Sequence, residues 1–194
     1  MQAFPEGPHA DLLSEAIRTE AAAQCALMAG DPAAAEGFAK AAACYRASWE
    51  AAPPRSFGRL VGMLKAAVIA SDAGEAAAYA RRALGDEADS PTSAYALAIA
   101  ALVDGDDELA AGAAARMRGG SDAFDRAADA IAALAAGDGT AYTAALGAIV
   151  TSFEERDAHL TGVAVADTAV MLERLAAPRG LAAHPGASPV LPPA

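Results

Sequence analysis

The chain has few of the residues that staple small domains or hold metals. Only two of its 194 residues are cysteines, and aromatic residues make up 5%. Cys25 and Cys44 stand 19 positions apart, which fits no zinc pattern because such patterns need close pairs. We expect both thiols to lie in the core as small apolar side chains. A disulfide or a reactive thiol is the alternative.

An export signal and long hydrophobic runs are also missing. Residues 1–8 contain neither a basic stretch nor an apolar stretch, so they do not have the features of a signal peptide. No uncharged apolar run reaches the roughly 18 residues that a membrane helix requires. The longest candidate, residues 139–153, is interrupted by threonine, glycine and serine. The sequence therefore predicts a cytoplasmic protein with no membrane partner.

Positive charge is scarce and unevenly placed. The net charge of −11 argues against nucleic acid as a partner, because phosphates need a basic surface. Residues 86–138 hold eleven acidic residues against three arginines. Residues 46–65, in contrast, hold four basic residues against one glutamate. This short segment is therefore the basic exception in an acidic chain.

Alanine dominates the residues that are present, at 60 of 194 positions, and it has the highest helix propensity. One sequence motif recurs around Asp31, Asp106 and Asp138, with a looser copy at Asp72. In it an apolar run is followed by Gly-Asp and then by an alanine-rich run. The steps of 41, 34 and 32 residues are close to the tetratricopeptide repeat length. The sequence predicts an all-α fold of eight or nine antiparallel helices, stacked as αα-hairpins in a right-handed, tetratricopeptide-like array.

Glycine, proline and capping residues place the expected helix boundaries. Helices are expected over about residues 11–29, 32–52, 55–70, 74–84, 91–104, 106–118, 121–136, 140–156 and 160–177. They form one domain, residues 1–177, whose acidic loop 86–90 suggests two halves, 1–85 and 91–177. Five prolines follow residue 177, so residues 178–194 are expected to form an extended tail.

No motif for catalysis or metal binding stands out. The G-x-S-x-G nucleophile elbow and the glycine-rich phosphate loops are missing. Glu155 and His159 are spaced to share a helix face, but a di-iron bundle needs more ligands than this one pair supplies. His9 and His184 lie in segments flanked by proline or glycine and are expected to be exposed. We therefore expect no cofactor, no metal site and no catalytic residue.

The strongest binding candidates surround the Pro53-Pro54 turn, inside the basic segment. The only tryptophan of the chain has arginines on both sides, a composition typical of interface hot spots. The alternative is that Tyr45 and Trp49 are the large core side chains of an alanine-rich helix. The predicted partner-binding residues are Tyr45, Arg46, Trp49, Arg55, Phe57 and Arg59.

The last third of the chain resembles α-helical bacterial proteins of the immunity-protein-49 type, in which a helix pair precedes an Arg-Gly-Leu or Arg-Gly-Trp turn and a short tail, Ser-Pro-x-Leu-Pro or Ser-Pro-x-Ile-Pro. The residues that carry the resemblance are Gly137-Asp138, Ala141-Tyr142, Ala145-Leu146, Glu155-Arg156-Asp157, Leu160, Val165-Ala166-Asp167-Thr168, Leu172, Arg179-Gly180-Leu181 and Ser188-Pro189-Val190-Leu191-Pro192. The resemblance implies an intracellular helical protein that neutralises a toxin by binding it. It implies no catalytic residue.

These observations predict a non-enzymatic protein-interaction module that binds a partner polypeptide, because helical repeats expose concave surfaces. It acts as a monomer or a homodimer. The alternative is a helical domain that binds or transforms a small molecule in a pocket between helices. The lining of the largest groove separates the two: apolar and arginine walls favour the partner protein, and convergent titratable groups favour the enzyme.

The tail generates a first testable prediction. Leu181, Val190 and Leu191 make it too apolar for a simple linker, so we expect it to lie in a groove of its own domain or of a second copy. Deleting residues 180–194 should then lower the melting temperature by several degrees, or convert a dimer to a monomer. An unchanged melting curve together with an unchanged mass in solution would show that the tail is a passive extension.

Overall fold

The computed structural model describes residues 7–85 and 88–193; residues 1–6, Ala194 and the Asp86–Glu87 part of the expected acidic loop lie outside it. The described residues form nine α-helices, one short 3-10 turn and no strand, which confirms the all-α prediction. The elements are α1 (Pro8–Met28), α2 (Ala34–Ala51), α3 (Gly58–Ile69), α4 (Gly74–Leu84), α5 (Pro91–Asp104), α6 (Asp107–Met117), α7 (Asp122–Ala135), α8 (Gly139–Glu154), α9 (Asp167–Ala176) and the 3-10 turn Ala177–Arg179.

The recurring Gly-Asp motif marks helix boundaries. Gly105 and Gly137 follow α5 and α7 with φ angles of 76° and 69°, in the left-handed region that glycine adopts without strain. The carboxylates of Asp106 and Asp138 then each accept a hydrogen bond from the backbone N–H three residues later, and so cap α6 and α8. One dipeptide therefore ends a helix and begins the next.

The starts of α3 and α9 come later in the chain than predicted. Helix α3 begins at Gly58 rather than at Arg55, because Arg55 has a φ of 68°, outside the right-handed helical region. Helix α9 begins at Asp167, because residues 160–166 form a loop in which Gly162 has a φ of 75°. Both irregular segments border the candidate site.

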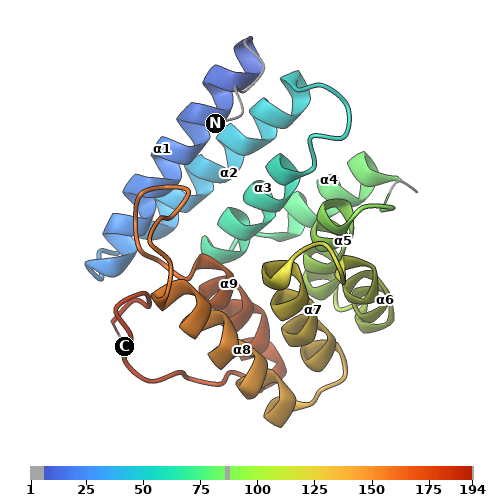
Figure 1. Ribbon diagram of the computed structural model, residues 1–194. Coiled ribbons are helices and arrows are strands. Elements are labelled where there is room, and N and C mark those ends of the chain that lie inside the picture. Colours follow the sequence, from blue (N-terminus) through green and yellow to red (C-terminus); the bar gives the residue numbers. More distant parts are fainter. Residues whose placement is uncertain (1–6, 86–87, 194) are drawn as a thin grey trace.

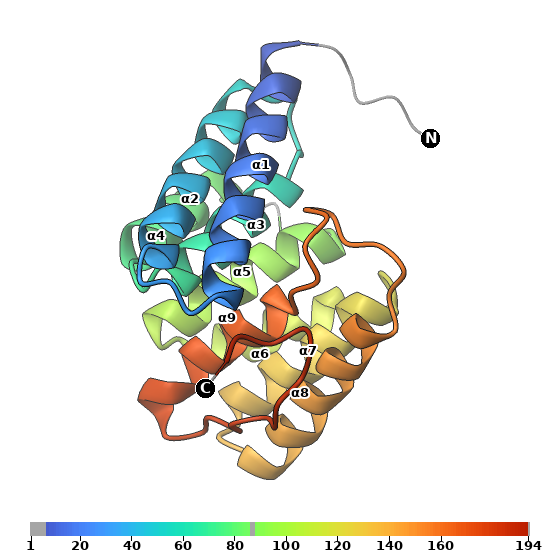
Figure 2. The ribbon, with the colours of Figure 1, turned by 90° about the vertical axis from the view of Figure 1, so that its left-hand side faces the viewer.

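Helix α3 lies at the centre of the arrangement (Figure 1). It packs against α2, α4 and α5, and also against α9 from the far end of the described chain. Elsewhere sequence neighbours pack together: α1 on α2, α5 on α6, α6 on α7 and α7 on α8. Figure 2 shows the α1–α2 pair at one end of the molecule and α8 at the other. The return of α9 to α3 brings distant parts of the sequence to one place.

Alanine allows the helices to approach closely. Helix α5 is buried around most of its surface, and five of its alanines have essentially no exposed area. Larger side chains fill the spaces between the helices. The largest fully buried ones are Tyr142, Phe38, Leu60, Met63, Leu64, Leu84, Ile99, Met117, Ile131, Leu134, Leu146 and Met171. Among the helices of the described ranges, none combines the length and apolar character needed to cross a bilayer.

The expectation that both cysteines lie in the core is wrong for Cys25. Cys25 is exposed and Cys44 is half-buried, and both are free thiols. Helix α1 is an outer helix that buries a single face, formed by Ala16, Glu20, Ala23 and Gln24. Because successive residues turn by about 100° around a helix, the next position, Cys25, points away from that face.

The chain after the 3-10 turn lies against α9 and the end of α8 without forming a helix (Figure 2). Val190 is buried, and its carbonyl accepts a hydrogen bond of 2.8 Å from the N–H of Ala166. The carboxylate of Glu173 on α9 accepts the backbone N–H groups of Ala183 and His184. These backbone hydrogen bonds hold the segment in place while the His184 side chain stays exposed.

Gly62 allows a test of how closely the helices pack. A Cβ atom built at Gly62 would lie 2.8 Å from Cε1 of the buried Tyr45 ring. We expect Gly62→Ala to lower the free energy of unfolding by about 1–3 kcal/mol, because the ring and its neighbours must move to make room. Urea denaturation followed by circular dichroism measures the change.

Gly112 in α6 is the matched control, because a Cβ atom there would meet nothing within 4 Å. Gly112→Ala should raise the free energy of unfolding by up to about 1 kcal/mol, since alanine is the better helix former. If both substitutions had the same effect, the close contact between Gly62 and Tyr45 would not be limiting.

Candidate functional site

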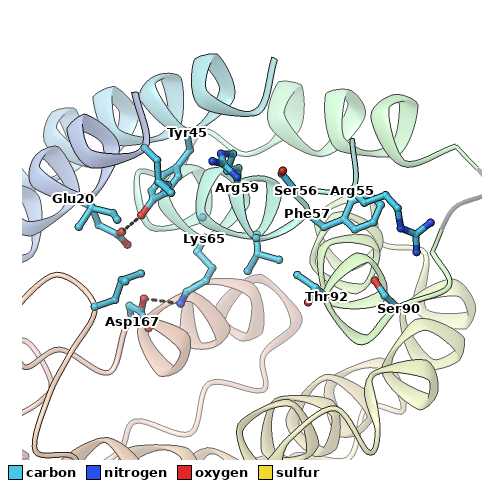
Figure 3. Close-up of a pocket in the computed structure, with 16 residues that line it drawn as sticks. Glu20, Tyr45, Arg55, Ser56, Phe57, Arg59, Lys65, Ser90, Thr92 and Asp167 are labelled. Carbon is cyan, nitrogen blue, oxygen red and sulfur yellow. Dashed lines mark hydrogen bonds and ion pairs between the residues drawn. The ribbon is translucent and has the colours of Figure 1, made fainter. Parts of the chain in front are cut away.

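A cleft of about 600 Å³ opens between α1, α3 and the starts of α5 and α9 (Figure 3). Its walls combine apolar side chains with several charged ones. The residues that line it are Leu13, Ile17, Glu20, Tyr45, Arg55, Ser56, Phe57, Gly58, Arg59, Val61, Gly62, Lys65, Ser90, Thr92, Leu160 and Asp167. They come from six separate segments of the chain, so only the folded protein brings them together.

A largely buried ion pair forms the floor of the cleft. Lys65 Nζ on α3 lies 2.5 Å from Asp167 Oδ2 at the start of α9, and the two side chains are only 15% and 16% exposed. Asp167 is the first residue of its helix, where the helix dipole favours a negative charge. Its other carboxylate oxygen accepts the backbone N–H of Thr168. The pair therefore ties α9 to the middle of the chain.

A second buried interaction lies beside this ion pair. The Tyr45 hydroxyl on α2 donates a hydrogen bond of 2.6 Å to Glu20 Oε2 on α1, and Glu20 is 4% exposed. Figure 3 shows the two interactions side by side on the same wall of the cleft. We call Glu20, Tyr45, Lys65 and Asp167 the floor cluster.

The floor cluster stabilises defined protonation states. Burial alone would lower the pKa of Lys65, but the charge of Asp167, helped by Tyr95 and Glu20, raises it above its ordinary value. Burial and the charge of Glu20 raise the pKa of the Tyr45 hydroxyl. At neutral pH the lysine is therefore an ammonium group and the tyrosine a hydrogen-bond donor. Neither is prepared to act as a nucleophile or a base.

Glu20 is the member of the cluster whose charged form is unfavourable. Burial raises the pKa of its carboxyl group, the charge of Asp167 raises it further, and Lys65 and the Tyr45 hydrogen bond only partly oppose this. Folding therefore makes the ionised form of Glu20 less favourable than it is in the unfolded chain.

The guanidinium of Arg59 lies at the mouth of the cleft. Its Nε donates a hydrogen bond of 2.8 Å to the Ser48 hydroxyl, which in turn donates to the carbonyl oxygen of His9 at 3.0 Å. Within residues 7–85 and 88–193, no carboxylate pairs with Arg59. Partial burial lowers its pKa from the usual arginine value. His9, expected to be exposed, is half-buried: its carbonyl oxygen accepts from Ser48 and its ring Nε2 is buried.

Four of the six predicted partner-binding residues line this cleft: Tyr45, Arg55, Phe57 and Arg59. Trp49 is not part of the lining but stacks on Phe57, with ring centroids 5.7 Å apart. Tyr45 is buried and Trp49 is half-buried against the core; these are the two side chains that the alternative interpretation placed there.

Arg46 faces a different part of the surface. It lines a shallower groove between α2, α3 and α4, where it pairs with Glu50 at 3.1 Å and Glu75 at 3.0 Å. Its guanidinium also lies over the ring of Tyr79, 4.1 Å from the centroid. These contacts explain Arg46 as a connection between helices, and the structure does not bring it to the cleft.

Sequence reasoning missed Glu20, Lys65 and Asp167. Glu20 and Lys65 stand at positions where helical periodicity calls for an apolar side chain, and Lys65 interrupts the otherwise apolar run from Leu60 to Ile69. Asp167 is an acidic residue at a helix start, where such residues are common. That interruption is the signal that could have identified Lys65. Its partners lie on other helices, and a single sequence gives no indication of that pairing.

The pair Glu155–His159 does not share a helix face, because α8 ends at Glu154. His159 lies in the following loop and stacks on Phe153, with ring centroids 6.0 Å apart. Among the residues that the structure describes, no group of three or more histidine, cysteine or acidic side chains is placed to hold a metal ion.

The raised pKa of Glu20 generates a prediction about pH. Because folding raises its pKa, the stability associated with Glu20 is present below about pH 4.5 and is lost as the pH rises through the raised value. Glu20→Gln keeps an acceptor for Tyr45 but removes this loss. Relative to the variant, the wild type should therefore lose stability between pH 4.5 and 7 in denaturant unfolding. A difference between the two proteins that stays constant across this range would contradict the prediction.

Comparisons of this chain with protein-family models, with curated proteins and with solved structures found no match. The resemblance of its last third to the immunity-protein-49 type and the tetratricopeptide-like geometry therefore stay predictions. Function has to be inferred from the side chains of the cleft itself.

Proposed function

We propose that this protein is a non-enzymatic interaction module that binds a polypeptide segment of a partner in the cleft. The observation that carries the proposal is the division of the cleft into two parts. Its floor groups are already paired with each other, whereas its rim offers apolar and arginine side chains. Such a rim is typical of surfaces that recognise proteins.

Leu160 supports the proposal most directly. It is the one large hydrophobic side chain among the described residues that is strongly exposed, at 76%, and it stands at the edge of the cleft. Val61, which is half-buried on α3, presents further apolar surface along the cleft wall. A partner side chain placed against these side chains would bury apolar surface that now faces water.

The second candidate function is binding or conversion of a small molecule in the same cleft. The convergence of Glu20, Tyr45, Lys65 and Asp167 favours it, because titratable groups gather at such sites. The protonation states of Lys65 and Tyr45 argue against a reaction that needs a base. We therefore place the polypeptide partner first.

We also propose a repeat type for the fold and a class of protein for the partner. The packing of sequence neighbours from α5 to α8 supports a degenerate αα-repeat of the tetratricopeptide-like type. The resemblance of residues 137–192 supports a toxin as the partner and a cytoplasmic location. Nothing in the proposal requires a nucleic acid, a membrane or a cofactor.

A peptide library displayed on phage tests the proposal. We expect selection on the immobilised protein to enrich peptides that bind in solution, and Leu160→Glu to weaken the best of them by about tenfold, the effect of losing roughly 1.4 kcal/mol of apolar contact. Isothermal titration calorimetry measures the affinities. Because Leu160 is exposed, the substitution should leave the melting temperature unchanged.

Ala115→Glu is the matched control, since it adds the same charge at an exposed position of α6, away from the cleft. It should leave peptide affinity unchanged. Failure to enrich any peptide, or equal binding to the wild type and Leu160→Glu, would reject the cleft as a polypeptide site. A small metabolite that raises the melting temperature under those conditions would favour the second candidate.

A further inference from the structure

The charges around the cleft balance at its floor but not at its mouth. At the floor, the carboxylates of Glu20 and Asp167 face the ammonium group of Lys65. Arg156 adds a second positive charge from the adjoining smaller cavity, which it lines together with Glu20, Lys65 and Asp167; burial lowers its pKa, and the charge of Asp167 opposes that effect. Two negative and two positive groups leave the floor close to neutral.

At the mouth, the positive charge of Arg59 is left over. Arg55 is nearby but is paired with Asp89, whose two oxygens lie 3.0 and 3.2 Å from its Nη2. Arg59 has only the neutral Ser48 hydroxyl as its side-chain partner within the described ranges. The mouth therefore attracts a negative group that this chain does not supply from the described residues.

Arg59 is also held in an orientation suited to a carboxylate. Ser48 is fully buried and anchored on the carbonyl of His9, and it fixes the guanidinium through Nε. This leaves the two terminal nitrogens for a ligand, and a carboxylate can accept from a guanidinium edge in a bidentate pair.

The start of α3 adds to the positive electrostatic potential around Arg59. Arg59 is the second residue of α3, and this helix has neither a capping side chain nor an acidic residue in its first turn. The partial positive charge at the start of the helix is thus uncompensated within α3 and adds to that of Arg59. Apolar side chains of Leu13, Ile17, Val61 and Leu160 line the same cleft.

We propose that the segment bound in the cleft carries an acidic residue flanked by apolar residues, whose carboxylate pairs with Arg59 while its neighbours pack against Val61 and Leu160. This inference rests on the proposed function and specifies the chemistry of the partner. The proposed ligand is thus an acidic polypeptide segment, although the chain that binds it has a net negative charge.

The experiment uses the phage-displayed random-peptide library as the probe, selected in parallel on the wild type and on Arg59→Gln. Peptides from the wild type should show glutamate or aspartate at one fixed position, enriched at least about fivefold over the unselected library. Peptides from Arg59→Gln should lose that enrichment. Arg116→Gln, an exposed arginine of α6 that lies outside the cleft, should retain it.

A thermodynamic cycle then tests the contact itself. Changing the enriched acidic residue of the peptide to its amide should weaken binding to the wild type by about tenfold or more, and binding to Arg59→Gln by less than about twofold. Arg59→Lys should restore part of the affinity, because it keeps the charge without the bidentate edge. Melting curves of both variants establish that they are folded.

The outcomes distinguish this inference from the proposal on which it rests. Peptides that depend on Leu160 but show no acidic position would overturn the inference and leave the cleft as a polypeptide site. An acidic preference that persists in Arg59→Gln would also overturn it. The absence of any enriched peptide would instead reject the proposed function.

Discussion

The ion pair between Lys65 and Asp167 joins the middle of the chain to its last helix, and the rest of the arrangement depends on that connection. It holds α9 against α3, and α9 in turn supports the loop before it and the segment after it. A buried ion pair is a costly way to join two helices, because both charges lose water. What the ion pair adds is a defined position for α9 on α3. An apolar contact would tolerate a shifted helix, whereas Lys65 Nζ and Asp167 Oδ2 must come within ion-pair distance.

The same ion pair explains why the floor of the cleft is polar and its rim is largely apolar. Alanine-rich helices bury little side-chain surface, so α1, α2 and α3 pack closely where alanine or glycine faces a neighbour, as at Gly62 and Tyr45. Where longer side chains intervene, they cannot be packed away and leave a cavity. Lys65 pairs with Asp167 there, Glu20 accepts a hydrogen bond from Tyr45, and the opposite charges of Lys65 and Glu20 attract each other. The proposed recognition surface is therefore confined to the rim.

Much of the helical architecture could be predicted from sequence, because its signals are local. Gly105-Asp106 and Gly137-Asp138 end and begin helices through their own backbone and side-chain geometry. Of the candidate site, the sequence identified Tyr45 and the segment around Pro53-Pro54 but not Glu20, Lys65 and Asp167. The start of α9 was placed too early because nothing local in residues 160–166 forbids a helix apart from Gly162. The pairing of Lys65 with Asp167 depends on how α9 returns to α3, and hydrophobic periodicity carries no information about such long-range contacts.

The distance in sequence between Lys65 and Asp167 has a consequence for biosynthesis. The ribosome makes Lys65 about a hundred residues before its partner, so the lysine spends several seconds of translation, at about 5–20 residues per second, without the carboxylate it needs. Glu20 precedes it in the chain and lies near it in the finished cluster, which makes it available as a temporary counter-ion. The residue that is electrostatically unfavourable in the completed fold can thus be useful while the chain is still being made.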